Sequence, residues 1–158
     1  MKNLRRSDSH PCCMPFVKKV IPMKTLLIFS LLWMTGEPNA TVAVLRARYG
    51  ARPDEVSAAI GPAIGGCCYA FGTEHRDAFA ARFGNAAATA WRHDTAGPDP
   101  GYLELRTLCR LALERAGVAT AAITQLGACT AEHPDELHSF RRDGAHAGRQ
   151  LSYIGWAS

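Results

Sequence analysis

The stretch YLELRTLCRLALERAGV, residues 102–118, predicts the most regular element of this 158-residue chain. Its apolar side chains recur at helical spacing, which predicts an amphipathic helix with one buried face. Gly117 lies just past the last apolar position, and a glycine there commonly ends a helix in the left-handed conformation. The predicted buried face consists of Leu105, Leu108, Cys109, Ala112 and Ala116.

Short apolar segments and further helical patterns flank this helix on both sides. Toward the amino terminus, the sequence predicts a helix over 41–49, a buried strand over 56–60 and a second helix over 71–83. Toward the carboxyl terminus, 121–130 and 149–157 predict strands. Helices that alternate with short strands indicate an α/β or layered α+β fold, with mixed sheets flanked by helices.

Charge and composition divide the chain near residue 40. Residues 1–40 hold six Lys or Arg and two acidic residues, a net charge of +4, whereas residues 41–158 hold twelve Arg and twelve acidic residues. No lysine follows Lys24 and no alanine precedes Ala40. This shift predicts an unrelated leader over 1–40 and the folded domain over 41–158. Because the domain has no excess of basic charge, nucleic acid is not expected as a partner.

The leader contains an apolar run at 25–34 that has two interpretations. A basic flank before a short apolar run is typical of a signal peptide, which would export the protein. The alternative is an incidental or mis-called start, which leaves a cytoplasmic protein, and the break in composition favours it. The run is about half of the ~20 residues that a membrane-spanning helix requires, so no stable span is predicted.

Six cysteines occur, at 12, 13, 67, 68, 109 and 129, and no two of them form a CxxC pair. This spacing predicts free thiols rather than a disulfide framework, and it gives no support for a zinc finger. Cys67 and Cys68 follow a glycine-rich loop, and three roles are open for them. The pair could supply a nucleophile activated by a nearby base or helix amino terminus, or it could supply metal ligands. The third role is that of small buried hydrophobic residues at a tight turn.

The stretch HSFRRDGAHAGRQ, residues 138–150, is the candidate anion site. Arg142 and Arg149 lie in it together with Asp143, and guanidinium groups suit the recognition of phosphate or carboxylate. The alternative is an ordinary surface turn that contains an Arg–Asp pair. The residues alone leave both alternatives open.

Three motifs in one order resemble the YfiH-like laccase-domain family. They are IGPAIGGCCYAFG at 60–72, YLELRTLCRLALERAGV at 102–118, and CTAEHPDELHSFRRDGAHAGRQLSYI at 129–154. Members of that family have been described as multicopper polyphenol oxidases, as purine nucleoside phosphorylases with adenosine deaminase activity, and in some cases as peptidoglycan editing factors. The resemblance implies the laccase-domain fold, a purine nucleoside and phosphate as partners, and a zinc or copper ion in complete members.

The resemblance also implies that the domain is incomplete. In the family the metal and catalytic ligands are a histidine in QVHG, a cysteine in TADC and a histidine in HAGWRG, and none of these strings occurs in the chain. We therefore expect the carboxy-terminal half of the domain, with no catalytic residue and no bound metal. An inactive fragment or interaction module of the same fold is the alternative, and an incomplete core predicts self-association.

The resemblance assigns the remaining candidate residues to two groups. Arg142, Arg149 and Asp143 are expected to line the substrate pocket. The other group is expected to shape a structural loop beside that pocket, with its two thiols packed behind the turn: Gly61, Pro62, Gly65, Gly66, Cys67 and Cys68. Glu104 stands where the family has an aspartate.

Overall fold

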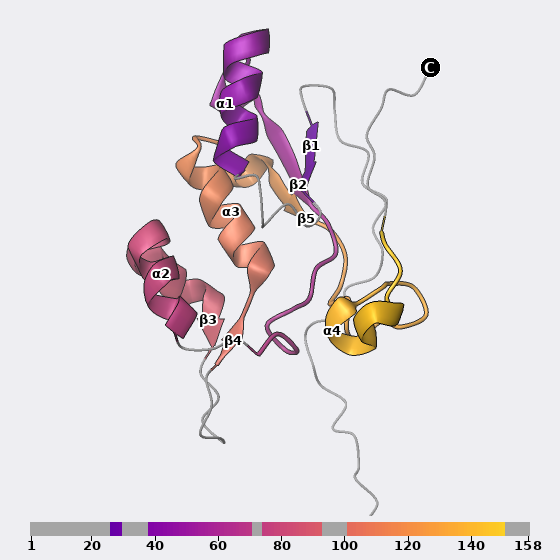
Figure 1. Cartoon of the computed structure of the whole chain (residues 1–158). Helices are drawn as coiled ribbons and strands as arrows, with labels where there is room; N and C mark the ends of the chain where they lie inside the picture. Colours follow the sequence, from indigo (N-terminus) through magenta and orange to yellow (C-terminus); the bar gives the residue numbers. More distant parts are fainter. Residues whose placement is uncertain (1–25, 30–37, 71–73, 93–100, 151–158) are drawn as a thin grey trace, which may run out of the picture.

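The computed structural model describes residues 26–29, 38–70, 74–92 and 101–150. Within these residues the chain forms a mixed α/β structure with a three-stranded sheet, a two-stranded sheet and flanking helices (Figure 1). The predicted fold class is therefore confirmed. No helix among these residues is long and apolar enough to cross a membrane.

The larger sheet consists of three parallel strands in the order β1-β2-β5. They are β1 (Leu26–Phe29), β2 (Ser57–Ile60) and β5 (Ile123–Gln125). The central strand β2 was predicted, and its last three residues are buried, as is usual for a parallel strand covered on both faces. Strand β1 comes from the segment predicted as a leader, so the structure pairs four residues of that segment with the domain.

Strand β5 is shorter than the predicted strand over 121–130. The amide of Leu126 still donates to the carbonyl of Ile60, but Gly127 then turns with φ +90° beside Pro62. Pro62 has no N–H to donate, so the regular ladder cannot pass this point. Pairing resumes as a parallel bridge between Ala63 and Cys129. The kink leaves two loops side by side beyond the sheet, and these loops carry the candidate site.

Helices α1 (Pro38–Tyr49) and α3 (Leu105–Arg115) pack against each other beside this sheet (Figure 1). Both helices were predicted, and both end before a glycine as expected. The buried face of α3 differs slightly from the predicted one, because it includes Leu113. The core of this layer is a group of six buried residues, Val42, Val56, Ala58, Ile60, Leu113 and Val118.

A second, smaller core lies at the amino-terminal end of α3. The antiparallel pair β3 (Trp91–Arg92) and β4 (Tyr102–Leu103) leads directly into α3, and α2 (Glu74–Phe83) packs beside it. Leu103 and Leu108 are at most 1% exposed, and Phe79 and Phe83 of α2 pack against them. Helix α2 was predicted from residue 71, but residues 71–73 lie outside the described ranges.

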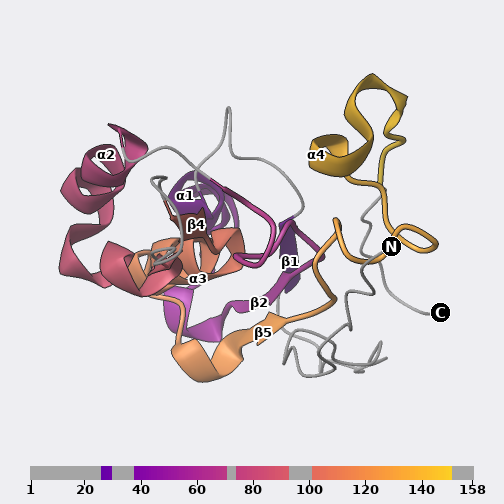
Figure 2. The same cartoon turned by 90° about the horizontal axis from the view of Figure 1, so that it is seen from below.

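The region predicted as an arginine-rich loop contains helix α4 (Phe140–Asp143), followed by a 3₁₀ turn over Gly144–His146. Both views place α4 on the opposite side of the three-stranded sheet from α2 (Figures 1 and 2). Three other 3₁₀ segments connect the elements: Pro53–Glu55, Gly84–Ala90 and Thr120–Ala122. The predicted last strand, 149–157, falls largely outside the described residues.

Candidate functional site

Two loops leave the carboxyl ends of neighbouring parallel strands and meet. Residues 61–70 follow β2, and residues 126–139 follow β5. Ligands of open parallel sheets commonly bind outside the carboxyl ends of the strands, because the loops there converge. The bridge between Ala63 and Cys129 holds the two loops in register at their start.

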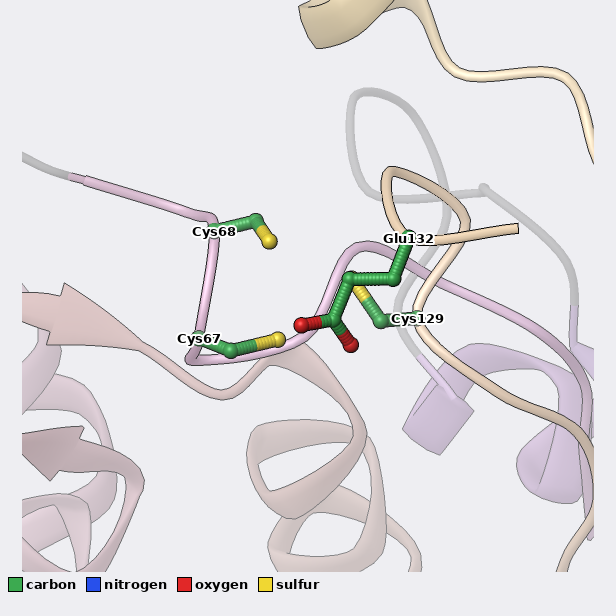
Figure 3. Close-up of side chains that lie close together, drawn as sticks. All are labelled: Cys67, Cys68, Cys129 and Glu132. Atoms are coloured by element: carbon green, nitrogen blue, oxygen red, sulfur yellow. The ribbon is translucent and has the colours of Figure 1, made fainter. Parts of the chain in front are cut away.

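Four potential metal ligands converge between these loops. They are the thiols of Cys67, Cys68 and Cys129 and the carboxylate of Glu132, and one ligand atom of each lies within 4.8 Å of all the others. Figure 3 shows the two cysteines of the first loop directed across the gap toward Cys129 and Glu132 of the second. Cys129 is completely buried, Cys67 and Cys68 are half-buried, and Glu132 is exposed.

Gly65 makes this convergence sterically feasible. Its amide donates a hydrogen bond of 3.2 Å to the sulfur of Cys129. A Cβ at this position would lie 3.1 Å from the sulfur of Cys67 and 3.3 Å from the Cβ of Cys129. Because both contacts would be tighter than ordinary packing, a side chain here would push Cys67 and Cys129 away by a few tenths of an ångström. The glycine therefore favours the close approach of the two loops through its lack of a side chain. Its φ does not lie in the left-handed region.

Without a bound ion the first-loop thiols are poor nucleophiles. Burial raises the pKa of Cys67, and the neighbouring sulfurs of Cys129 and Cys68 raise it further. Burial also raises the pKa of Cys68, to about 11. A reactive cysteine needs the opposite shift, because the thiolate is the nucleophile. The raised pKa values therefore disfavour the interpretation of Cys67 or Cys68 as a nucleophile.

Glu104 and Arg106 connect the first loop to helix α3. The carboxylate of Glu104 accepts from the Gly66 amide at 3.0 Å and from the Nε of Arg106 at 2.9 Å. It also accepts from the backbone amide of Arg106, which makes it the N-cap of α3. Arg106 in turn donates to the carbonyl of Gly127 at 3.2 Å. The pair therefore fastens both loops to one helix end.

The pKa of Glu104 results from two opposing effects. Burial alone would raise it, because burial disfavours the charged form. The hydrogen bonds from Arg106 and from the Gly66 amide outweigh burial, so the pKa lies below its usual value. Glu104 is consequently ionised at neutral pH, as its capping role requires.

Arg142 holds the second loop to α4. Its Nη1 donates to the carbonyls of Thr130 and Ala131 at 2.7 and 3.3 Å, and its Nη2 donates to that of Leu137 at 2.9 Å. Its Nε and Nη2 each donate to Asp143 at 2.7 Å, and this pairing holds the pKa of Asp143 below its usual value. All five guanidinium N–H groups are thus engaged within the chain.

Arg149 and Arg141 are both exposed. Arg149 donates to the carbonyls of Ala147 and Gly148, both at 3.2 Å. Arg141 donates to the carbonyl of Ala70 at 3.2 Å, and its guanidinium lies 4.8 Å from the ring centre of Tyr69. Arg141 therefore contacts the end of the first loop and Arg142 contacts the second. The contact of Arg142, Arg149 and Asp143 with a substrate stays a prediction.

The sequence placed the loop over 61–68 and the Arg142–Asp143 pair, but it missed the partners of the cysteine pair. Cys129 and Glu132 are more than sixty residues further along the chain, so rules based on short ligand spacing could not connect them. The available signal was the spacing Cys129-x-x-Glu132 at the end of a predicted strand. The packing role predicted for Cys67 and Cys68 stays a prediction.

Known proteins share both the sequence pattern and the fold. The chain is 31% identical to purine nucleoside phosphorylase LACC1 of Mus musculus, over 77% of this chain and 28% of that protein. It is 37% identical to purine nucleoside phosphorylase YlmD of Bacillus subtilis, over 67% of this chain and 37% of that protein. The crystal structure of YlmD from Geobacillus stearothermophilus superposes with a TM-score of 0.59 at 30% identity, over 66% of this chain and 38% of that one.

The matched relatives are much longer than the matched region, so the chain spans less than half of their length. A family model described as multi-copper polyphenol oxidoreductase laccase matches residues 34–157, which include both loops of the site. This match covers most of the chain and confirms the resemblance drawn from the three motifs. The chain belongs to the multi-copper polyphenol oxidoreductase laccase family.

Proposed function

We propose that these residues form the carboxy-terminal half of a purine nucleoside phosphorylase domain. The observation that carries the proposal is the similarity to proteins named purine nucleoside phosphorylases, which covers 77% of this chain for LACC1 of Mus musculus and 67% for YlmD of Bacillus subtilis. The family match over residues 34–157 includes the two site loops and helix α3. In phosphorolysis, an oxygen of inorganic phosphate attacks C1′ of the nucleoside. The bond from C1′ to the purine nitrogen breaks, and the base leaves with its electron pair and a proton while ribose 1-phosphate forms.

Arg149 is the residue we propose for contact with phosphate. It is exposed, and the hydrogen bonds recorded for it go to backbone carbonyls of its own turn, which a charged anion would replace favourably. We also propose that Arg142 and Asp143 line the substrate pocket. Arg142 uses its five donors to hold the second loop, and we propose that the pair contributes by fixing the shape of the pocket wall.

We propose no reaction step for the metal that the family implies. The motifs that carry the His/Cys/His ligands do not occur in these 158 residues. The donors present are three thiols and a carboxylate, which together can close a tetrahedral shell. A closed shell is typical of structural ions, because a catalytic ion keeps a position open for water or substrate.

A second candidate function is a non-catalytic module that keeps the fold. The absent ligand motifs favour it for the chain as given, since those motifs carry the family's reactive groups. Both candidates predict that the 158 residues alone release no base from inosine in the presence of phosphate. They differ once the part of a longer relative that precedes the matched region is supplied.

A chimera distinguishes the two candidates. The part of Geobacillus YlmD that precedes the matched region would be fused to residues 34–158 of this chain, and hypoxanthine release from inosine and phosphate would be measured. The phosphorylase proposal predicts turnover by the chimera, and it predicts that Arg149→Ala raises the KM for phosphate by roughly tenfold or more, as the loss of a charge-assisted contact should. A folded chimera without turnover would contradict it and support the non-catalytic module.

A further inference from the structure

The cysteine cluster has the ligand chemistry of a particular class of metal ion. Thiolates are soft ligands that select zinc, Cu(I) or iron–sulfur clusters over magnesium, calcium or manganese. The fourth ligand, Glu132, supplies a harder oxygen, which zinc accepts and Cu(I) disfavours. Three sulfurs and one carboxylate oxygen therefore favour zinc.

The separation of the four groups also suits one tetrahedral ion. Two sulfurs that bind the same zinc at about 2.3 Å lie about 3.8 Å apart when the angle between them is tetrahedral. The four ligand atoms of the cluster lie within 4.8 Å of one another. Figure 3 shows the four side chains already directed toward a common point. Small rotations of these side chains would therefore bring the ligand atoms from their present separations to those around one zinc ion.

The surroundings of the cluster support a bound ion. The Gly65 amide donates to the sulfur of Cys129, which is how outer-shell groups orient and stabilise a metal-bound thiolate. The missing Cβ of Gly65 leaves room for the sulfur of Cys67 and for the Cβ of Cys129. Exposed Glu132 and half-buried Cys68 lie on the solvent side, which gives an ion a path inward.

We propose that Cys67, Cys68, Cys129 and Glu132 bind one zinc ion, which joins the loop after β2 to the loop after β5. On binding, the ion displaces the protons of the three thiols, because zinc binds cysteine as the thiolate. The bound zinc holds loop 61–70 and loop 126–139 together beyond the kink at Gly127, where the β ladder stops. The inference rests on these four residues and is independent of the proposed enzymatic function.

Zinc binding by the purified 158-residue chain tests this inference. Metal-free protein would be titrated with zinc against a chromogenic chelator, and cobalt would then replace zinc as a spectroscopic probe. We expect one zinc per chain and, with cobalt, a sulfur-to-metal charge-transfer band together with tetrahedral d–d bands. Glu132→Gln should weaken zinc binding by roughly tenfold or more without unfolding the chain, because Glu132 is exposed.

Matched variants keep the result interpretable. Cys129→Ser should abolish binding of the ion, whereas Cys109→Ser, on α3 and outside the cluster, should keep it. A Cys12→Ser, Cys13→Ser double variant should also keep it. The proposal is overturned if the chain binds no zinc, if zinc survives in Cys129→Ser, or if Glu132→Gln leaves both the affinity and the cobalt spectrum unchanged. Preferential binding of Cu(I) with zinc excluded would overturn it as well.

Discussion

Replacement of Glu104 by alanine removes the group that joins the first site loop to helix α3. The Gly66 amide and the amide of Arg106 would lose their acceptor. The Arg106 side chain, which is 12% exposed, would lose its ion pair with Glu104. Loss of an N-cap costs about 1 kcal/mol, and loss of a partly buried charge-assisted hydrogen bond costs about 1.5–3 kcal/mol. These contributions share one carboxylate and do not add fully, so we expect Glu104→Ala to lower the free energy of unfolding by about 3 kcal/mol.

Urea unfolding followed by circular dichroism measures this effect. With a slope of about 1–3 kcal/mol per molar urea, the midpoint should fall by about 1–3 M. Glu104→Asp keeps the charge and the cap but shortens the reach, so it should recover a large part of the loss. The control is Asp77→Asn, because its pair with Arg76 is exposed and should change stability by less than about 0.5 kcal/mol. A loss below about 1 kcal/mol in Glu104→Ala would refute the assigned role of this carboxylate.

Four further predictions concern acid stability, the buried core, the turn at Gly127 and association. The pKa of Glu104 is lower in the folded than in the unfolded chain. Its contribution to the free energy of unfolding is therefore present above the unfolded pKa of about 4.3, and it is lost as the pH falls through the folded pKa. In acid titrations, the stability of Glu104→Ala should depend less on pH than that of the wild type. Leu113→Ala, at a completely buried position, should lower the free energy of unfolding in urea by about 2–5 kcal/mol. Gly127→Ala should lower it by at least about 2 kcal/mol, because φ is +90° and the new Cβ would lie 2.6 Å from Pro62. An unchanged midpoint in either variant would contradict the packing described for it. If the chain is half of a shared core, light scattering should find dimers or larger species, and a monodisperse monomer would contradict that expectation.

The elements that the sequence predicted well are those determined by local patterns. Helix α3 follows from its apolar stripe and from Gly117, and both signals lie within one stretch of seventeen residues. The buried face was still incomplete, because the contribution of Leu113 depends on the sheet and on α1, which a single stretch does not reveal. Strand β5 was predicted too long because Pro62, on the neighbouring loop, ends its pairing.

The candidate site could be predicted only in part, for the same physical reason. The glycine-rich loop and the Arg142–Asp143 pair are local and were recognised. The cluster depends on β2 and β5 lying side by side, which brings Cys129 and Glu132 to residues more than sixty positions earlier in the chain. Likewise, the five donors of Arg142 are directed at carbonyls of the second loop, and their use could not be inferred from residue type.

The products formed by the YlmD chimera provide the most direct measurement of function. Inosine would be incubated with and without phosphate, and hypoxanthine, ribose 1-phosphate and free ribose would be quantified. We predict one ribose 1-phosphate for each hypoxanthine and no base release without phosphate. Release of free ribose, equal release without phosphate, or no release from a folded chimera would contradict the proposal that this chain forms part of a purine nucleoside phosphorylase.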